Sequence, residues 1–223
     1  SFQDFINLEY KGVGVGKFAS STLMRQIRKG SLDFGDSADK RMAVVCLSNS
    51  ISAVEGASKL LNIRKPSIFV IVDRGYTPYG EMFDACINRE IPVITWNVAH
   101  RDNTIMLKRY NLSNRDSHPA SLSKSSWKAM QEIDWSNEKR NKLYRELSSS
   151  YESGEWYSEV GTQFEKKSFE KGEIIDRYNL DPSKKTAVIF SHVFWDATFF
   201  WGKDLFRDYE DWFVQTVKGA CKN

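Results

Sequence analysis

The sequence predicts an α/β fold built on a parallel β-sheet, and one stretch in its first half carries most of this prediction. Ile68–Val72 is a run of β-branched and aromatic residues, as is typical of a strand covered on both faces. A polar loop, Asp73–Gly80, and a helix-like stretch, Glu81–Glu90, lead to a second strand-like run at Ile91–Trp96. This order forms a βαβ unit, so we expect the two strands to be parallel neighbours in one sheet.

A second strand–helix signal lies near the C-terminus. The apolar run Ala187–Phe190 predicts a buried strand, and an aromatic loop follows it as far as Asp204, a candidate helix N-cap. The helix behind Asp204 has its larger side chains at helical spacing, at Leu205, Tyr209, Trp212, Phe213, Thr216 and Val217. This unit again places polar residues just after a strand.

Helical patterns fill most of the remaining chain. Helices are expected from the glycine-rich stretch at 12–16 to about Lys29, and from an Asp36 N-cap to about Asn62. Shorter helices are expected at 127–133, 137–147 and 174–180, with a further strand at 104–107. The expected fold is therefore α/β with helical additions.

Composition excludes several classes of protein. The chain has 223 residues, of which 41% are hydrophobic and 13% aromatic, enough for a packed core. Its net charge of +3 comes from scattered residues, so no nucleic-acid partner is expected. No apolar run is long enough to span a bilayer, which leaves only peripheral membrane contact. Cys46, Cys86 and Cys221 lie far apart without metal-ligand spacing, which predicts no metal site and fits a reducing, cytoplasmic location. No cofactor is expected either.

The early glycines admit a competing interpretation. Gly14, Gly16 and Ala19 match a loose dinucleotide fingerprint, G-x-G-x-x-A. That motif needs a strand directly before it, and Ile6–Tyr10 is a poor one. We therefore favour a turn that lets a helix pack closely. A phosphate bound at the helix N-terminus and a nicotinamide-dependent oxidoreductase stay open as alternatives.

Candidate substrate-binding residues gather on two loops. If the strands of the βαβ unit are parallel, Asp73–Gly80 and Asn97–Asp102 meet at one edge of the sheet, where α/β proteins bind ligands. Tyrosines suit a sugar because the ring stacks on a pyranose while the hydroxyl bonds its edge. The substrate-binding candidates are Asp73, Arg74, Tyr76, Tyr79 and Arg101. His100 and Asp102 are the candidates for a catalytic base.

Three further candidates follow the C-terminal strand. His192 could donate to a phosphate or a sugar hydroxyl, with Asp196 fixing its tautomer. Lys203, at the start of the last helix, could neutralise a diphosphate leaving group. These three are the nucleotide-binding candidates, and the alternatives are a hydrogen-bonded structural histidine and a solvated lysine.

Several of these motifs resemble a known family. Asp181-Pro182-x-Lys184-Lys185 with the strand leading to Ser191–Asp196, and then Leu205-Phe206 and Tyr209–Trp212, resemble bacterial capsular polysaccharide biosynthesis proteins. Those proteins are similar to glycosyltransferases of the GT-B type, and Lys11–Arg25 and the Ala85–Ile94 junction fit the same resemblance. It implies a sugar-nucleotide-dependent glycosyltransferase of capsule or surface polysaccharide synthesis. Its substrates would be a sugar nucleotide and a saccharide acceptor.

The resemblance also implies a domain division. Residues 1–150 would be a Rossmann-like, acceptor-side domain, 151–183 a connecting helical segment, and 184–223 the first strand–helix unit of a donor-side domain. A lone strand–helix unit cannot bury both faces of its strand. We therefore expect a fragment that is inactive alone, with Ala187–Val217 packed back onto the first domain or filling a partner's sheet edge. The alternative function is a non-catalytic sugar- or nucleotide-binding α/β module.

Overall fold

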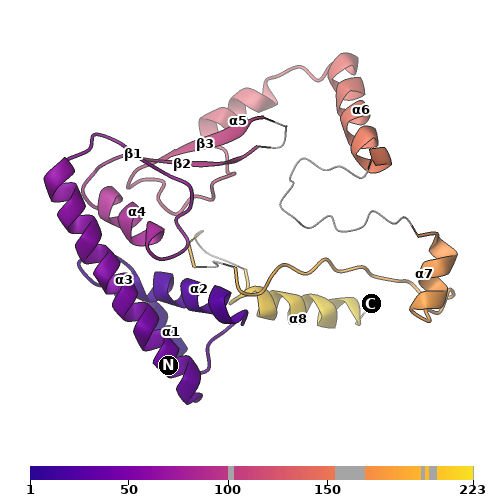
Figure 1. The fold of residues 1–223 in the computed structure, drawn as a ribbon. Coiled ribbons are helices and arrows are strands. Elements are labelled where there is room, and N and C mark those ends of the chain that lie inside the picture. Colours follow the sequence, from indigo (N-terminus) through magenta and orange to yellow (C-terminus); the bar gives the residue numbers. More distant parts are fainter. Residues whose placement is uncertain (100–102, 154–168, 197–198, 201–204, 223) are drawn as a thin grey trace. The chain divides into compact units, whose positions relative to one another are not determined.

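The computed structural model describes residues 1–99, 103–153, 169–196, 199–200 and 205–222, and these form a mixed α/β structure (Figure 1). The chain divides into two compact units. The first contains residues 1–97, 106–120 and 189–223, and the second contains residues 98–105 and 121–188. The best-defined candidate site lies in the first unit.

Three helices open the first unit: α1 (Phe2–Ile6), α2 (Val15–Ile27) and α3 (Ser37–Arg64). The Asp36 carboxylate accepts a hydrogen bond from the Ala38 N–H at 2.7 Å, so the predicted N-cap of α3 is confirmed. The helices predicted behind the glycine-rich stretch and behind Asp36 are both present. The short helix α1 was not predicted, because five residues are too few to show a helical period.

The βαβ prediction is confirmed. β1 (Phe69–Ile71) leads through α4 (Tyr79–Ile87) to β2 (Val93–Val98), and the two strands pair in parallel. β3 (Ile105–Tyr110) completes a sheet of order β1-β2-β3. Between β2 and β3 the Ala99 N–H donates to the Thr104 carbonyl at 3.1 Å. The sheet is therefore small and mixed, and a larger Rossmann-like architecture stays a prediction.

Helices cover one face of β1 and β2. Ile71, Val93 and Thr95 are buried, and the first two belong to the core cluster formed with α3 and α4. On the opposite face Val70 is 60% exposed, and Trp96 is exposed as well. The prediction that β1 is covered on both faces is thus wrong for the described residues. Continuous β-branched sequence shows that both faces are apolar, but it does not supply the second covering layer.

Two glycines allow the helices to pack closely. A Cβ atom built on Gly16 would lie 1.9 Å from the Phe5 carbonyl oxygen, so α2 touches the backbone of α1 there. A Cβ on Gly80 would lie 2.0 Å from Cε1 of Phe18, so α4 packs equally closely against α2.

The core cluster between α1, α2 and α3 contains Phe5, Ala19, Leu23, Met24, Leu32, Ala43 and Cys46. Cys46 and Cys86 are buried, as predicted.

Aromatic residues near the C-terminus pack onto the first unit. The Phe200 ring stacks on Phe18, with centroids 5.1 Å apart, and Trp195 and Phe199 pack against the α1–α3 core. α8 (Tyr209–Ala220) follows, with Asp208 rather than the predicted Asp204 as its N-cap. Asp204 itself lies outside the described residues.

The predicted strand at Ala187–Phe190 is absent. These residues belong to no helix or strand, and the side chains of Val188 and Phe190 are 72% and 86% exposed. The sequence has strand propensity here, but among the described residues no neighbouring strand pairs with it. Strand formation requires such a partner, because an isolated strand leaves its backbone groups unpaired.

The second unit contains α5 (Lys124–Gln131), α6 (Asn137–Ser153) and α7 (Lys171–Arg177). All three correspond to predicted helices, and α6 begins after Ser136, whose hydroxyl accepts from the Lys139 N–H at 3.3 Å. No residue of α5 or α7 is buried. Across the described parts of both units, no helix combines the length and the apolar character needed to cross a membrane.

Candidate functional site

The loop between β1 and α4 carries several predicted site residues, and hydrogen bonds hold it in one conformation. The Asp73 carboxylate accepts from the Gly75 N–H at 2.8 Å, which closes a tight turn. The Thr77 N–H donates to the Thr22 hydroxyl of α2 at 3.0 Å, which fixes the loop to that helix. The loop therefore presents its side chains from a rigid support.

Tyr76 connects this loop to the C-terminal part of the chain through a hydrogen bond. Its hydroxyl donates to Oδ1 of Asp196 at 2.7 Å. The Arg25 guanidinium lies 4.6 Å from the centroid of its ring, within range of a cation–π interaction. A residue of the β1–α4 loop and a residue 120 positions later thus share one hydrogen bond.

His192 completes the arrangement on the other side of Asp196. Its Nε2 lies 3.8 Å from Oδ2 of Asp196, and its ring stacks on Tyr209 with centroids 4.3 Å apart. Its Nδ1 lies 2.9 Å from the Val193 carbonyl oxygen. Because a carbonyl oxygen only accepts hydrogen bonds, Nδ1 must carry a proton to bond there. Nε2 is then the ring nitrogen that faces the Asp196 carboxylate.

We call Tyr76, Asp196 and His192 the acidic–imidazole cluster. The side chains of His192 and Asp196 are nearly half exposed, so a ligand in solvent can reach them. An imidazole next to a carboxylate can accept a proton from a hydroxyl and then be stabilised as a cation. Aromatic rings such as Tyr209 suit the apolar face of a sugar. This chemistry fits a polyhydroxylated ligand.

The buried carboxyl group of Glu81 holds the β1–α4 loop in place. Glu81, in the first turn of α4, is fully buried, and its Oε1 accepts from the hydroxyls of Ser50 at 2.5 Å and Thr77 at 2.7 Å. Burial raises the pKa of Glu81, and the two hydroxyl donors partly oppose that rise. Glu81 thereby ties the β1–α4 loop to α3, and it positions Tyr76 without reaching solvent.

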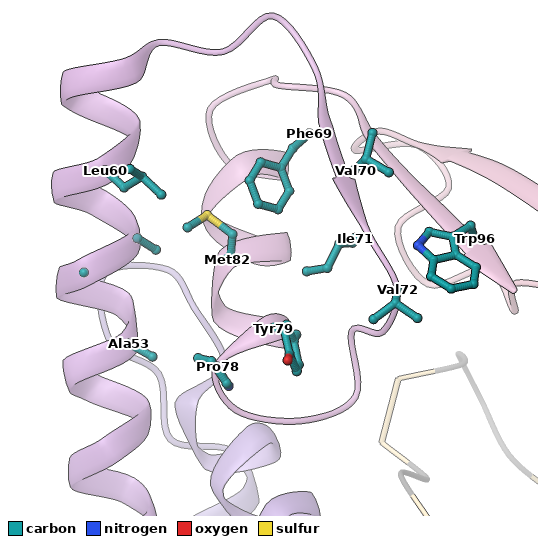
Figure 2. Close-up of a pocket in the computed structure, with 12 residues that line it drawn as sticks. Ala53, Leu60, Phe69, Val70, Ile71, Val72, Pro78, Tyr79, Met82 and Trp96 are labelled. Carbon is teal, nitrogen blue, oxygen red and sulfur yellow. The ribbon is translucent and has the colours of Figure 1, made fainter.

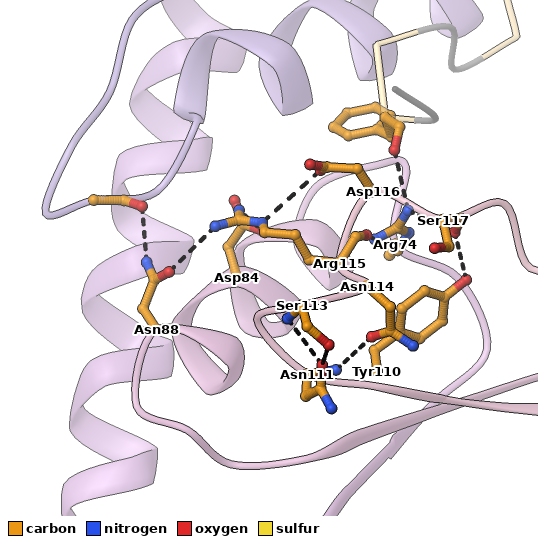
Figure 3. A network of polar contacts seen from close by, with 12 residues as sticks. Arg74, Asp84, Asn88, Tyr110, Asn111, Ser113, Asn114, Arg115, Asp116 and Ser117 are labelled. Atoms are coloured by element: carbon orange, nitrogen blue, oxygen red, sulfur yellow. Dashed lines mark hydrogen bonds and ion pairs between the residues drawn. The ribbon is translucent and has the colours of Figure 1, made fainter. Parts of the chain in front are cut away.

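Arg74 lies in the core, although it belongs to the same loop (Figure 3). Its guanidinium sits between the rings of Phe83 and Tyr110, 4.7 Å from each centroid. It donates to three backbone carbonyls, those of Arg115, Ser117 and Phe200. Burial lowers the pKa of Arg74. These hydrogen bonds hold the segment after β3, at Arg115 and Ser117, against the core. The Arg74 guanidinium is therefore not part of the ligand-binding rim expected from the sequence.

The N-terminus of α2 is occupied by the chain itself. Three N–H groups at this end donate to protein acceptors: that of Gly14 to Asp84, that of Val15 to the Val13 carbonyl and that of Gly16 to the Leu8 carbonyl. Asp84 also accepts from Arg115 at 2.7 Å, and burial raises the pKa of its carboxyl group, although Arg115 opposes the rise. Since Asp84 fills the anion position, the structure gives no support to a phosphate bound there.

The segment before the glycines also disfavours the dinucleotide interpretation. α1 precedes them, and the only pairing between α1 and α2 in the described chain is a single bridge between Tyr10 and Val13. A dinucleotide fingerprint requires a full strand at this place. Gly16 is explained instead by its contact with the α1 backbone.

The remaining predicted residues are distributed as follows. Tyr79 is exposed at the start of α4 and lines an apolar groove with Val72. His100, Arg101, Asp102 and Lys203 lie outside the described residues. Arg25 and Tyr209 touch the acidic–imidazole cluster but were not predicted as site residues, because helical sequence alone does not show which loop a helix will meet.

Within the described residues, no three side chains of His, Cys, Asp or Glu gather as a metal site would require. In comparisons with known proteins, no family model matches the chain, and no similar curated protein or solved structure is found.

Proposed function

We propose that the chain acts in sugar-nucleotide-dependent glycosyl transfer, in bacterial capsule or surface polysaccharide biosynthesis, and is built on the GT-B plan. One observation carries this proposal: Tyr76, on the loop at the carboxyl end of β1 in a parallel βαβ unit, bonds to Asp196, which in turn lies beside His192. That end is where α/β proteins bind ligands. The sequence resemblance contributes the reaction class.

In the proposed reaction the acceptor hydroxyl lies against Nε2 of His192. The hydroxyl oxygen forms a bond to the anomeric carbon of the donor, the bond from that carbon to the nucleoside diphosphate breaks, and the hydroxyl proton passes to Nε2. Asp196, 3.8 Å from Nε2, stabilises the imidazolium, and Tyr76 holds Asp196 in place. A positioned general base of this kind contributes roughly 10²–10⁴-fold in rate.

His100 and Asp102 remain alternative candidates for the base, and Lys203 remains a candidate for contact with the diphosphate. A non-catalytic saccharide-binding module is the second candidate function. It is favoured by the fact that both oxygens of Asp196 already face protein groups, Tyr76 and His192. A cluster whose carboxylate already has two protein partners could bind a sugar hydroxyl without taking up its proton.

NMR titration of the ¹⁵N-labelled chain tests the binding site. We expect oligosaccharides from bacterial surface polysaccharides to shift the amide resonances of Tyr76, His192 and Asp196. Asp196→Asn removes one charged hydrogen-bonding group, worth about 1.5–3 kcal/mol, so it should weaken binding by about tenfold or more. His118→Gln is the matched control, because this imidazole bonds locally to the Ala120 N–H and should leave binding unchanged.

Three outcomes would change the assignment. If no saccharide shifts the cluster while a dinucleotide shifts Gly12–Ala19, the oxidoreductase alternative replaces it. We further expect the 223-residue chain alone to turn over no UDP-, GDP- or CMP-sugar above background. Turnover that disappears in His192→Gln would refute the expected inactivity but identify His192 as the base. Binding without turnover, even with a complete donor-side domain supplied, would favour the binding module.

A further inference from the structure

An open apolar groove of about 570 Å³ lies beside β1, in the first unit (Figure 2). Its walls are α3, α4 and β1, and its lining includes Leu60, Met82, Phe69, Ile71, Val70 and Trp96. Grooves of this volume are large enough to bury a drug-sized molecule or a short stretch of polypeptide. The acidic–imidazole cluster contributes no residue to this lining.

The groove extends around both faces of β1. Phe69 and Ile71 point toward Met82 of α4, whereas Val70 and Trp96 lie on the opposite side of the strand (Figure 2). A groove bordered by both faces of one strand is centred on the edge of that strand. β1 is an edge strand of the described sheet, whose order is β1-β2-β3.

The backbone of β1 indicates which kind of molecule fits this edge. The Phe69 N–H donates to the Pro92 carbonyl at 2.9 Å, so Phe69 faces β2. In a parallel pair every second residue faces the same neighbour, so Ile71 also faces β2, and the N–H and C=O of Val70 face the groove. An added strand can bond to both groups of Val70, whereas a helix or an acyl chain cannot.

We propose that the groove takes the segment Ala187–Phe190 of a second copy of the chain, which adds to the open edge of β1. A strand in this position has one face on α3 and α4 and the other beside Val70, so both of its faces must be apolar. Ala187–Phe190 meets this requirement with four consecutive apolar residues. Among the described residues outside helices and strands, it is the only such run.

The exposure and length of the segment agree with this pairing. Val188 and Phe190 are both largely exposed to solvent, and the segment belongs to no strand. Four residues extend over about 13 Å at 3.3 Å per residue, enough to cover β1 and its flanking residues. Mutual exchange of the segment gives a closed two-fold dimer, in which each copy supplies one strand and one groove.

Cysteine cross-linking between two different variants tests for contact between copies. Val70→Cys and Val188→Cys are each placed on a Cys221→Ser background, which leaves only the buried native Cys46 and Cys86. When differently mass-tagged variants are mixed and mildly oxidised, we expect a mixed disulfide at least tenfold above that of the control mixture. The control replaces Val70→Cys by Val44→Cys, since Val44 is exposed on α3 and is not part of the groove lining.

Hydrogen exchange supplies a second readout that does not depend on cysteine geometry. We expect the Val70 amide to be protected in concentrated protein, and to lose protection on dilution or in Val188→Asp, while the Ile71 amide stays protected throughout. Sedimentation should show a dimer that Val188→Asp converts to monomer. A monomer at every concentration, Val70 protection that is independent of concentration, or equal cross-linking in both mixtures would each overturn the proposal.

Discussion

Gly16→Ala tests whether the early glycines serve packing. A Cβ at this position would lie 1.9 Å from the Phe5 carbonyl oxygen and 2.9 Å from that of Ile6, and both are backbone atoms that cannot rotate away. Relief requires α1 to shift or detach, and complete detachment would expose two buried side chains worth about 1.5–3 kcal/mol each. The helix preference of alanine returns up to about 1 kcal/mol. We therefore expect a net loss of about 1–3 kcal/mol in the free energy of unfolding.

Gly56→Ala is the matched control, because it makes the same substitution inside α3, where no atom lies within 4 Å of the new Cβ. It should raise the free energy of unfolding by about 0.4–1 kcal/mol, through helix preference and the reduced entropy of the unfolded chain. Urea denaturation followed by circular dichroism measures both variants. If Gly16→Ala is as stable as the parent protein, then contact with α1 is not the reason for this glycine. Lost dinucleotide binding at unchanged stability would instead favour the oxidoreductase.

Three further substitutions test the core and its charges. Only the Ile71 face of β1 is covered, so in urea denaturation of dilute protein Ile71→Ala should lower the free energy of unfolding by about 2–5 kcal/mol and Val70→Ala by under about 0.5 kcal/mol. Similar losses for the two variants would refute the one-sided sheet. Burial raises the pKa of Glu81 in the folded protein, so its ionisation weakens folding as the pH rises above the unfolded pKa of about 4.3. The stability of Glu81→Gln relative to the parent protein should therefore rise with pH, by at most about 1.4 kcal/mol per pH unit. A stability difference that does not change with pH would refute this. The hydrogen bond from the Lys29 ammonium lowers the pKa of buried Asp39, so Asp39→Asn should lower the free energy of unfolding by about 1–3 kcal/mol at neutral pH. This loss should shrink as the pH falls below about 3.9, the unfolded pKa of an aspartate. A loss that stays constant in acid would contradict the pairing.

The elements that the sequence predicted correctly are those specified by local signals. The apolar periods of α2 and α3 and the Asp36 N-cap lie within single segments, and the strand–loop–helix–strand order between residues 68 and 96 is equally local. The failed strand at Ala187–Phe190 has a strong local signal too, but a strand also needs a partner edge. Propensity describes only the segment itself, so it could not reveal that no described strand pairs with this one.

The candidate site shows the same division between local and long-range information. Arg74 and Tyr76 stand two positions apart in one polar loop, yet Arg74 lies between two core rings while Tyr76 bonds to Asp196. The sequence placed Tyr76 in a saccharide site and Asp196 and His192 in a separate nucleotide site. The structure brings these three residues into one cluster, because Trp195, Phe199 and Phe200 pack onto the core around α2 and thereby fix the loop that carries Asp196. These aromatic side chains follow the strand-like run at Ala187–Phe190, and their packing against the core fixes the position of the segment that carries them. The polar side chains of this segment, His192 and Asp196, thereby come to lie beside Tyr76.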